Sequence, residues 1–147
     1  MKRLALLLAA LVAAGCGGPL GWIPGGKLDG EPVEAPVDDW AFASKTENLQ
    51  LETDPADPYS VNIWFVTEGP KLWVFAGGGE SSTWAKHLLA DPRALVRIDD
   101  KLYPRKAVRV TDPAEIVHVE ELYLDKYDYT RDPKGVFGPV EFRLDPP

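Results

Sequence analysis

Cys16 is the only cysteine in this 147-residue chain, so no disulfide within the chain can stabilise its fold. Stability must come from apolar side chains buried in a single core, which a chain of this length can supply. Cys16 also ends a distinctive segment. A basic start, Met1-Lys2-Arg3, precedes an unbroken apolar run over residues 4–14. That run is about half of the roughly 20 residues that a helix needs to cross a bilayer, which argues against a permanent span.

The basic start, the apolar run and the small residues before Cys16 have the three-part layout of a bacterial export signal. The segment resembles the lipoprotein signal, in which the cysteine becomes an acylated N-terminus, although Ala13 stands where leucine is commoner. The resemblance implies a signal peptide over residues 1–15 and a lipid anchor on Cys16 that faces the periplasm. Gly17-Gly18 lacks the aspartate of inner-membrane retention, which implies the outer membrane. An ordinary secretory signal with a chance cysteine is the alternative.

Residues 16–36 are rich in glycine and proline, and this composition is typical of a flexible tether. Within it, Trp22, Ile23 and Leu28 are apolar enough to pack on the domain that we expect over residues 37–147. Loss of the signal peptide leaves 14 basic against 23 acidic side chains. This negative balance repels nucleic acid, so we expect a membrane partner through the lipid and no nucleic-acid partner.

Alternating and continuous apolar segments predict six strands and two helices in a single domain. The predicted strands cover residues 48–53, 60–67, 71–76, 94–99, 102–110 and 140–144, and the predicted helices cover residues 82–90 and 113–127. Ser81 or Ser82 can cap the first helix. Asp112, Pro113 and Glu115 predict a capping box at the second. The class is α+β, a six-stranded antiparallel split β-barrel or sandwich with two inserted helices.

One stretch of the sequence resembles the FMN-binding split-barrel group, which includes pyridoxamine phosphate oxidases and deazaflavin-dependent reductases. The resemblance rests on Leu72-Trp73-Val74-Phe75, the glycines 77–79, Trp84, Leu88, Asp91-Pro92, Val96-Arg97-Ile98 and Ala107-Val108-Arg109-Val110. It favours the split barrel and implies a ligand site at the seam between the barrel halves. Such a site is often shared by two subunits, so a homodimer is compatible with it.

The resemblance also implies where a flavin phosphate would bind. The matching positions are Ser81, Ser82 and Lys86, and the glycines Gly77, Gly78 and Gly79 would let the backbone approach the ligand closely. Hydroxyls and free amides at a helix N-terminus suit an anion. The alternative is that the serines are only helix caps and Lys86 is only a solvated residue. Trp64 is either a core residue or part of the seam.

The loop at residues 52–59 contains three acids and no base, whereas deazaflavin-dependent relatives have a basic loop there. A deazaflavin with an acidic tail is therefore disfavoured, while FMN stays a candidate cofactor. His87 is a candidate acid near the glycines, although a plain surface histidine is the simpler interpretation. His118 lies in an amphipathic helix, and no metal-binding motif accompanies either histidine. Catalytic residues cannot be assigned from the sequence.

Two functions are consistent with these observations. One is a lipid-anchored domain that binds a small molecule or a cell-envelope partner without catalysis. The other is an FMN-dependent oxidoreductase of the pyridoxamine-phosphate-oxidase-like group. The acidic loop, the few basic residues near the seam and the export signal favour the first.

Overall fold

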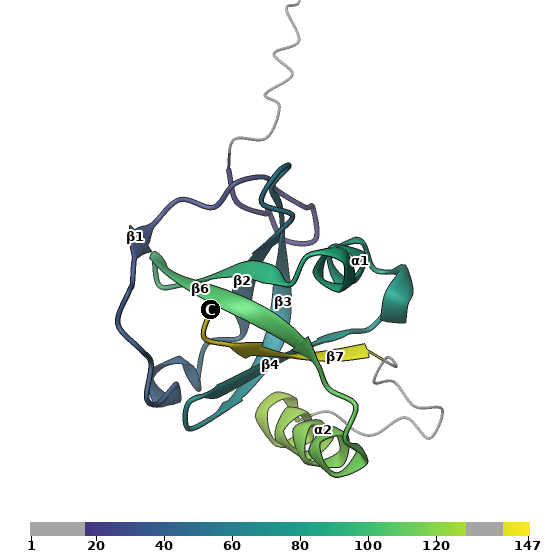
Figure 1. Cartoon of the computed structure of the whole chain (residues 1–147). Coiled ribbons are helices and arrows are strands. Elements are labelled where there is room, and N and C mark those ends of the chain that lie inside the picture. Colours follow the sequence, from purple (N-terminus) through teal and green to yellow (C-terminus); the bar gives the residue numbers. More distant parts are fainter. Residues whose placement is uncertain (1–16, 129–139) are drawn as a thin grey trace, which may run out of the picture.

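A computed structural model describes residues 17–128 and 140–147, and the predicted signal peptide and Cys16 lie outside these ranges. Within the described residues, six antiparallel strands close into a barrel (Figure 1). Their order around the barrel is β6 (Lys101–Arg109), β5 (Arg93–Ile98), β2 (Asn48–Thr53), β3 (Tyr59–Glu68), β4 (Lys71–Ala76) and β7 (Val140–Asp145), and β7 pairs again with β6. A seventh strand, β1 (Glu31–Pro32), adds to β6 in parallel. The predicted α+β split barrel is confirmed.

The element boundaries lie close to those predicted from the sequence. The helices are α1 (Thr83–Ala90) and α2 (Pro113–Tyr127). Asp99 and Asp100 both have positive φ in the two-residue turn between β5 and β6. That conformation matches the right-handed twist of hairpin strands and makes this a tight hairpin turn.

Strands β3 and β4 are buried on both faces where they pair, which explains the apolar stretches Ile63–Val66 and Leu72–Ala76. Phe65, Val74 and Phe142 point into the barrel and form part of its main core. On the outer face, Val66 of β3 and Trp73 of β4 pack against Val119 and Tyr123 of α2, in a second cluster. Helix α2 therefore covers the outside of the sheet at β3 and β4, as Figure 1 shows.

The two open ends of the barrel are closed by different elements. Helix α1 contributes Trp84, Ala85 and Leu88 to the core near the β2–β3 turn. At the other end, Trp40 stands before the short helix η1 (Ala41–Ala43). Its backbone N–H donates to Gly69 O and its indole Nε1–H donates to Pro70 O. These bonds tie η1 to the β3–β4 turn.

The segment that the sequence predicted as a tether contacts the barrel along much of its length. Gly25 pairs with Ser60 through two backbone hydrogen bonds, and Leu28 is 2% exposed. The N–H groups of Glu31 and Val33 donate to Asp100 O and Leu102 O. This part of the chain therefore packs on the outside of the barrel, as the apolar Leu28 indicated, whereas Trp22 and Ile23, which the sequence also suggested, stay exposed. Within the described ranges, no helix is long and apolar enough to span a bilayer.

Candidate functional site

The glycine loop after β4 leads directly into α1, as the sequence predicted, but its three glycines differ in their surroundings. Gly79 is buried and has a φ of +60°, which favours glycine. A Cβ on Gly78 would lie 2.9 Å from Ser82 Oγ. A Cβ on Gly77 would meet nothing closer than 4.0 Å. Of Gly77 and Gly78, which are both exposed, Gly77 has the more open surroundings for an approaching ligand.

The two serines of the loop have separate roles. Ser81 lies in the 3-10 turn η2 (Gly79–Ser81), and its hydroxyl donates to Gly78 O. Ser82 occupies the N-cap position of α1, but its side chain makes no capping hydrogen bond. The Ser82 hydroxyl is therefore not used as a cap, and the N–H groups of the first turn lack this acceptor. Of the two hydroxyls, that of Ser82 is the one poised for an anion.

The charged side chains around the loop limit what it can bind. Glu80 projects from η2 and forms an ion pair with Arg109 of β6 at 2.7 Å, so the charge of Arg109 is already paired. Lys86 lies one turn into α1 and is exposed to solvent. The loop thus presents one carboxylate, one paired guanidinium and one solvated ammonium, a weak electrostatic site for a phosphate.

Trp64, the remaining predicted site residue, is part of β3, and its side chain packs against α2. Its ring stacks on Tyr127 with centroids 4.3 Å apart, and Tyr123 Oη donates to Trp64 O. Its side chain is 37% exposed, so it is not a fully buried core residue. The residues suggested by the resemblance are therefore divided between the α1 loop and the α2 face.

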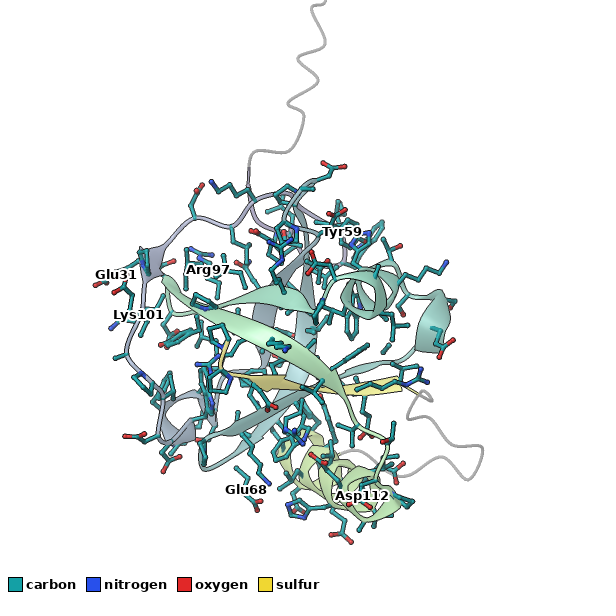
Figure 2. The ribbon with its side chains drawn as sticks, in the orientation of Figure 1. Glu31, Tyr59, Glu68, Arg97, Lys101 and Asp112 are labelled. Carbon is teal, nitrogen blue, oxygen red and sulfur yellow. The ribbon has the colours of Figure 1, made fainter. Side chains whose placement is uncertain are left out.

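The two histidines make simple contacts. His87 is a half-buried residue of α1, whose Nδ1 lies 3.0 Å from Thr53 Oγ1 and whose ring meets Tyr59 edge to face. Figure 2 shows Tyr59 at this end of the barrel, beside α1. His118 pairs with Glu68 at 2.9 Å on the surface. Neither contact directs a histidine toward the glycine loop as a proton donor. The contacts of His87 are consistent with a role in packing, and that of His118 with a surface ion pair.

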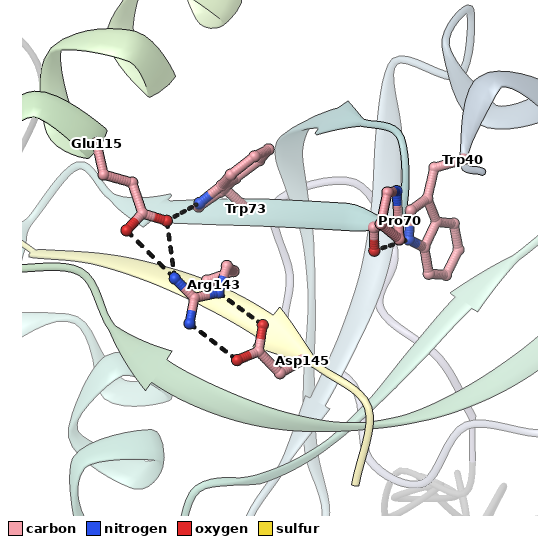
Figure 3. Close-up of polar contacts among 6 residues, drawn as sticks. All are labelled: Trp40, Pro70, Trp73, Glu115, Arg143 and Asp145. Carbon is pink, nitrogen blue, oxygen red and sulfur yellow. Dashed lines mark hydrogen bonds and ion pairs between the residues drawn. The ribbon is translucent and has the colours of Figure 1, made fainter. Parts of the chain in front are cut away.

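A polar network fastens the start of α2 to the barrel (Figure 3). Glu115 accepts hydrogen bonds from Trp73 Nε1 and Arg143 Nη1, both at 2.9 Å. Arg143 also holds Asp145 through two bonds, of 2.7 and 3.0 Å. Burial acts to raise the pKa of Glu115, but the bonds from Trp73 and Arg143 outweigh it, so this pKa is lowered. The bonds to Asp145 and Glu115 raise the pKa of Arg143.

This network corrects the predicted capping box. Asp112 caps α2 as expected, because its carboxylate accepts from Ala114 N–H at 3.3 Å. The Glu115 carboxylate, however, pairs with Arg143 and Trp73 across the interface rather than completing the box. A charge-assisted bond to arginine is stronger than a bond to one backbone amide. Tertiary contact therefore decides the orientation of this side chain.

One potential binding group was not recognised from the sequence. Arg105 is only 5% exposed and lines a cavity of about 400 Å³ at the end of the barrel that Trp40 closes. The strand pattern could have located it, because Tyr103, Arg105 and Ala107 alternate with the exposed Pro104 and Lys106. In the described part of the chain, no group of three or more acidic, histidine or cysteine side chains is arranged to hold a metal.

Comparison with known proteins identifies the fold. No family model matches the sequence, and no curated protein matches it. Among solved structures, a candidate pyridoxamine 5′-phosphate oxidase from Listeria innocua is similar, with a TM-score of 0.57 and 16% identity over 72% of this chain and 88% of its own. An F420-H2-dependent reductase is also similar, with a TM-score of 0.54 and 19% identity over 68% of this chain and 95% of its own.

A third similar structure is a candidate 5-nitroimidazole antibiotic resistance protein from Bacteroides thetaiotaomicron, with a TM-score of 0.57 and 12% identity over 76% and 80% of the two chains. These neighbours define the class. The domain has the split-barrel fold of the pyridoxamine-phosphate-oxidase-like, FMN-binding proteins. Because identity is low, the likeness extends to the fold and to no residue of a cofactor site.

Proposed function

We propose that this protein is a lipid-anchored envelope protein whose split barrel binds a small molecule or an envelope partner without catalysis. The observation that carries the non-catalytic part is the chemistry of the glycine loop. The Ser81 hydroxyl is bonded to Gly78 O, and Arg109 is paired with Glu80. An incoming flavin phosphate would find the Ser82 hydroxyl, the amides of the first turn and the solvated Lys86. It would also meet the carboxylate of Glu80.

The location is supported by the residues that follow Cys16. Leu20 and Ile23 form a small turn closed by two backbone hydrogen bonds, with Trp22 at its tip. Leu20 is 76% exposed and Trp22 is 90% exposed, the highest exposures among the large apolar side chains described. Asn62 holds the turn on the barrel by donating to Gly21 O at 2.9 Å. An exposed apolar turn a few residues after an acylated cysteine would lie at a membrane interface, where tryptophan is favoured.

The anchor is tested by replacing its attachment site. In a Gram-negative host, Cys16→Ser is expected to move the full-length protein from the outer-membrane fraction to a soluble or precursor form. It should also abolish incorporation of labelled palmitate. Gly17→Ser, which changes the next residue and keeps the cysteine, should leave both properties unchanged. If wild-type protein incorporates no labelled fatty acid, the lipoprotein assignment fails.

The second candidate is an FMN-dependent oxidoreductase, and it is favoured by the fold and by the open backbone at Gly77. If this candidate is correct, purified protein absorbs at flavin wavelengths or quenches the fluorescence of added FMN. Under the non-catalytic proposal we expect neither signal at micromolar protein. Flavin binding in wild-type protein would reverse the order of the two candidates.

The same titration tests the loop as the anion site. If FMN binds there, the double change Ser82→Ala, Lys86→Ala should weaken it by about 2–4 kcal/mol, since each charge-assisted or buried hydrogen bond lost costs about 1–3 kcal/mol. Lys106→Ala, which removes an equal charge from the exposed face of β6, should have no effect. Equal FMN affinity in the double variant and the wild type would place the flavin elsewhere.

A further inference from the structure

Among the residues that the structure describes, Arg105 is a buried cation without an anionic partner. Its side chain points inward from β6, and its Nε–H has no hydrogen-bond acceptor. The guanidinium carbon lies 4.9 Å from the centroid of the Trp40 ring, which stacks with the cation and replaces part of its lost hydration. A guanidinium removed from water normally pairs with a carboxylate or phosphate, because burying a lone charge is costly.

Two acids that act on Arg105 or share its cavity do not fill this role. The negative charge of Asp145 favours the charged form of Arg105 at a distance, but both carboxylate oxygens of Asp145 are bound by Arg143. Glu34 borders the same cavity from the exposed segment before η1. Within residues 17–128 and 140–147, Arg105 forms no ion pair. Burial accordingly lowers the pKa of Arg105.

The cavity in front of this cation has the size and lining of a small-molecule site. Its volume of about 400 Å³ lies within the usual range for ligand pockets, roughly 300–1,000 Å³. Its walls are mainly apolar and include Val33 and the rings of Pro36, Pro104, Pro146 and Pro147. Proline rings lose little freedom when a ligand binds, so these walls are already arranged for contact.

We propose that this cavity binds a small monocarboxylate with an apolar body, whose carboxylate pairs with Arg105 and whose body packs against the prolines. A planar guanidinium suits the two oxygens of a carboxylate. Glu34 and Asp145 would repel a second negative charge, which favours a monoanion over a phosphate dianion. The site depends neither on the lipid anchor nor on the glycine loop, so it stands if either of those assignments fails.

The test is calorimetric titration of purified full-length protein with decanoate, with decan-1-ol as the neutral analogue and with inorganic phosphate. Decanoate is expected to bind at least tenfold more tightly than decanol and than phosphate. In Arg105→Met this preference over decanol should disappear, and decanoate affinity should fall at least tenfold. Lys106→Met removes the same charge from the exposed face of the same strand and should leave decanoate binding unchanged.

A second variant tests the site independently in case Arg105→Met does not fold. Ala35 is exposed and borders the cavity, so Ala35→Trp should fill it and weaken decanoate binding at least tenfold while Arg105 remains. Absence of decanoate binding to wild-type protein overturns the proposal. So does a preference for phosphate, or decanoate binding of wild-type strength in either Arg105→Met or Ala35→Trp.

Discussion

Replacing Trp40 with alanine is expected to lower the free energy of unfolding by about 3–5 kcal/mol, the usual cost of truncating a buried tryptophan. The Trp40 side chain is fully buried, its ring meets Tyr103 edge to face at 5.1 Å, and its indole N–H donates to Pro70 O at 3.1 Å. Truncation removes the apolar contact, leaves Pro70 O without this donor and takes away the surface on which Arg105 stacks (Figure 3 shows the Trp40–Pro70 bond).

Urea denaturation followed by circular dichroism would measure this loss. Trp22→Ala is the matched control, because Trp22 is 90% exposed and its loss should change stability by no more than about 0.5 kcal/mol. If Trp40→Ala unfolds at the same urea concentration as the wild type, η1 does not contribute to the closure of the barrel.

The barrel could be predicted from the sequence because its signals are local. The alternation in residues 48–53 and the proline after Asp112 each fix one element without knowledge of its neighbours. Trp40 gave no such signal. It stands alone before a three-residue helix in a proline-rich segment, and only the packed structure shows that it closes one end of the core. Strand β1 was missed for the same reason, since two exposed residues carry no periodic pattern.

The candidate site was predicted less well, because it depends on which side chains meet. The glycine loop and Ser82 lie at the start of α1 as the sequence indicated. The ion pair between Glu80 and Arg109 joins residues from separate elements, so no local sequence pattern predicts it. Arg105 is the opposite case. The alternation of β6 places Arg105 on the inner face. Because arginine is usually exposed, the sequence alone did not indicate that its side chain is buried.

A carboxylate beneath α2 makes the stability of the barrel depend on pH. Glu141 lies on the outer face of β7 between Val140 and Phe142, which point into the core, and it is only 4% exposed. Its Oε2 has no hydrogen-bond partner in the described part of the chain. Burial, together with the charges of Glu120 and Glu115 on α2, raises the pKa of Glu141 from 4.5 to about 7. The folded protein therefore keeps a proton near neutral pH that the unfolded chain releases.

The expected result is that Glu141→Gln stabilises the protein at pH 8 by about 2–3 kcal/mol and changes little at pH 4. Between about pH 4.5 and pH 7 the folded state binds more protons than the unfolded state, so the wild-type free energy of unfolding falls as pH rises. A shift of this size corresponds to about 3 kcal/mol at 1.36 kcal/mol per pKa unit. Glutamine resembles the protonated carboxyl in shape and cannot ionise, so the variant escapes this loss.

Urea denaturation of wild type and variant at pH 4, 6 and 8 would measure the difference, in which the pH dependence of Glu115 and other acids common to both proteins cancels. Glu121→Gln, on the exposed face of α2, is the control and should show no pH-dependent gain. The decisive quantity is the change in the stability difference between pH 4 and pH 8. A difference that stays constant over this range would mean that Glu141 has the same pKa in the folded and the unfolded state, and that the α2 interface accommodates its charge.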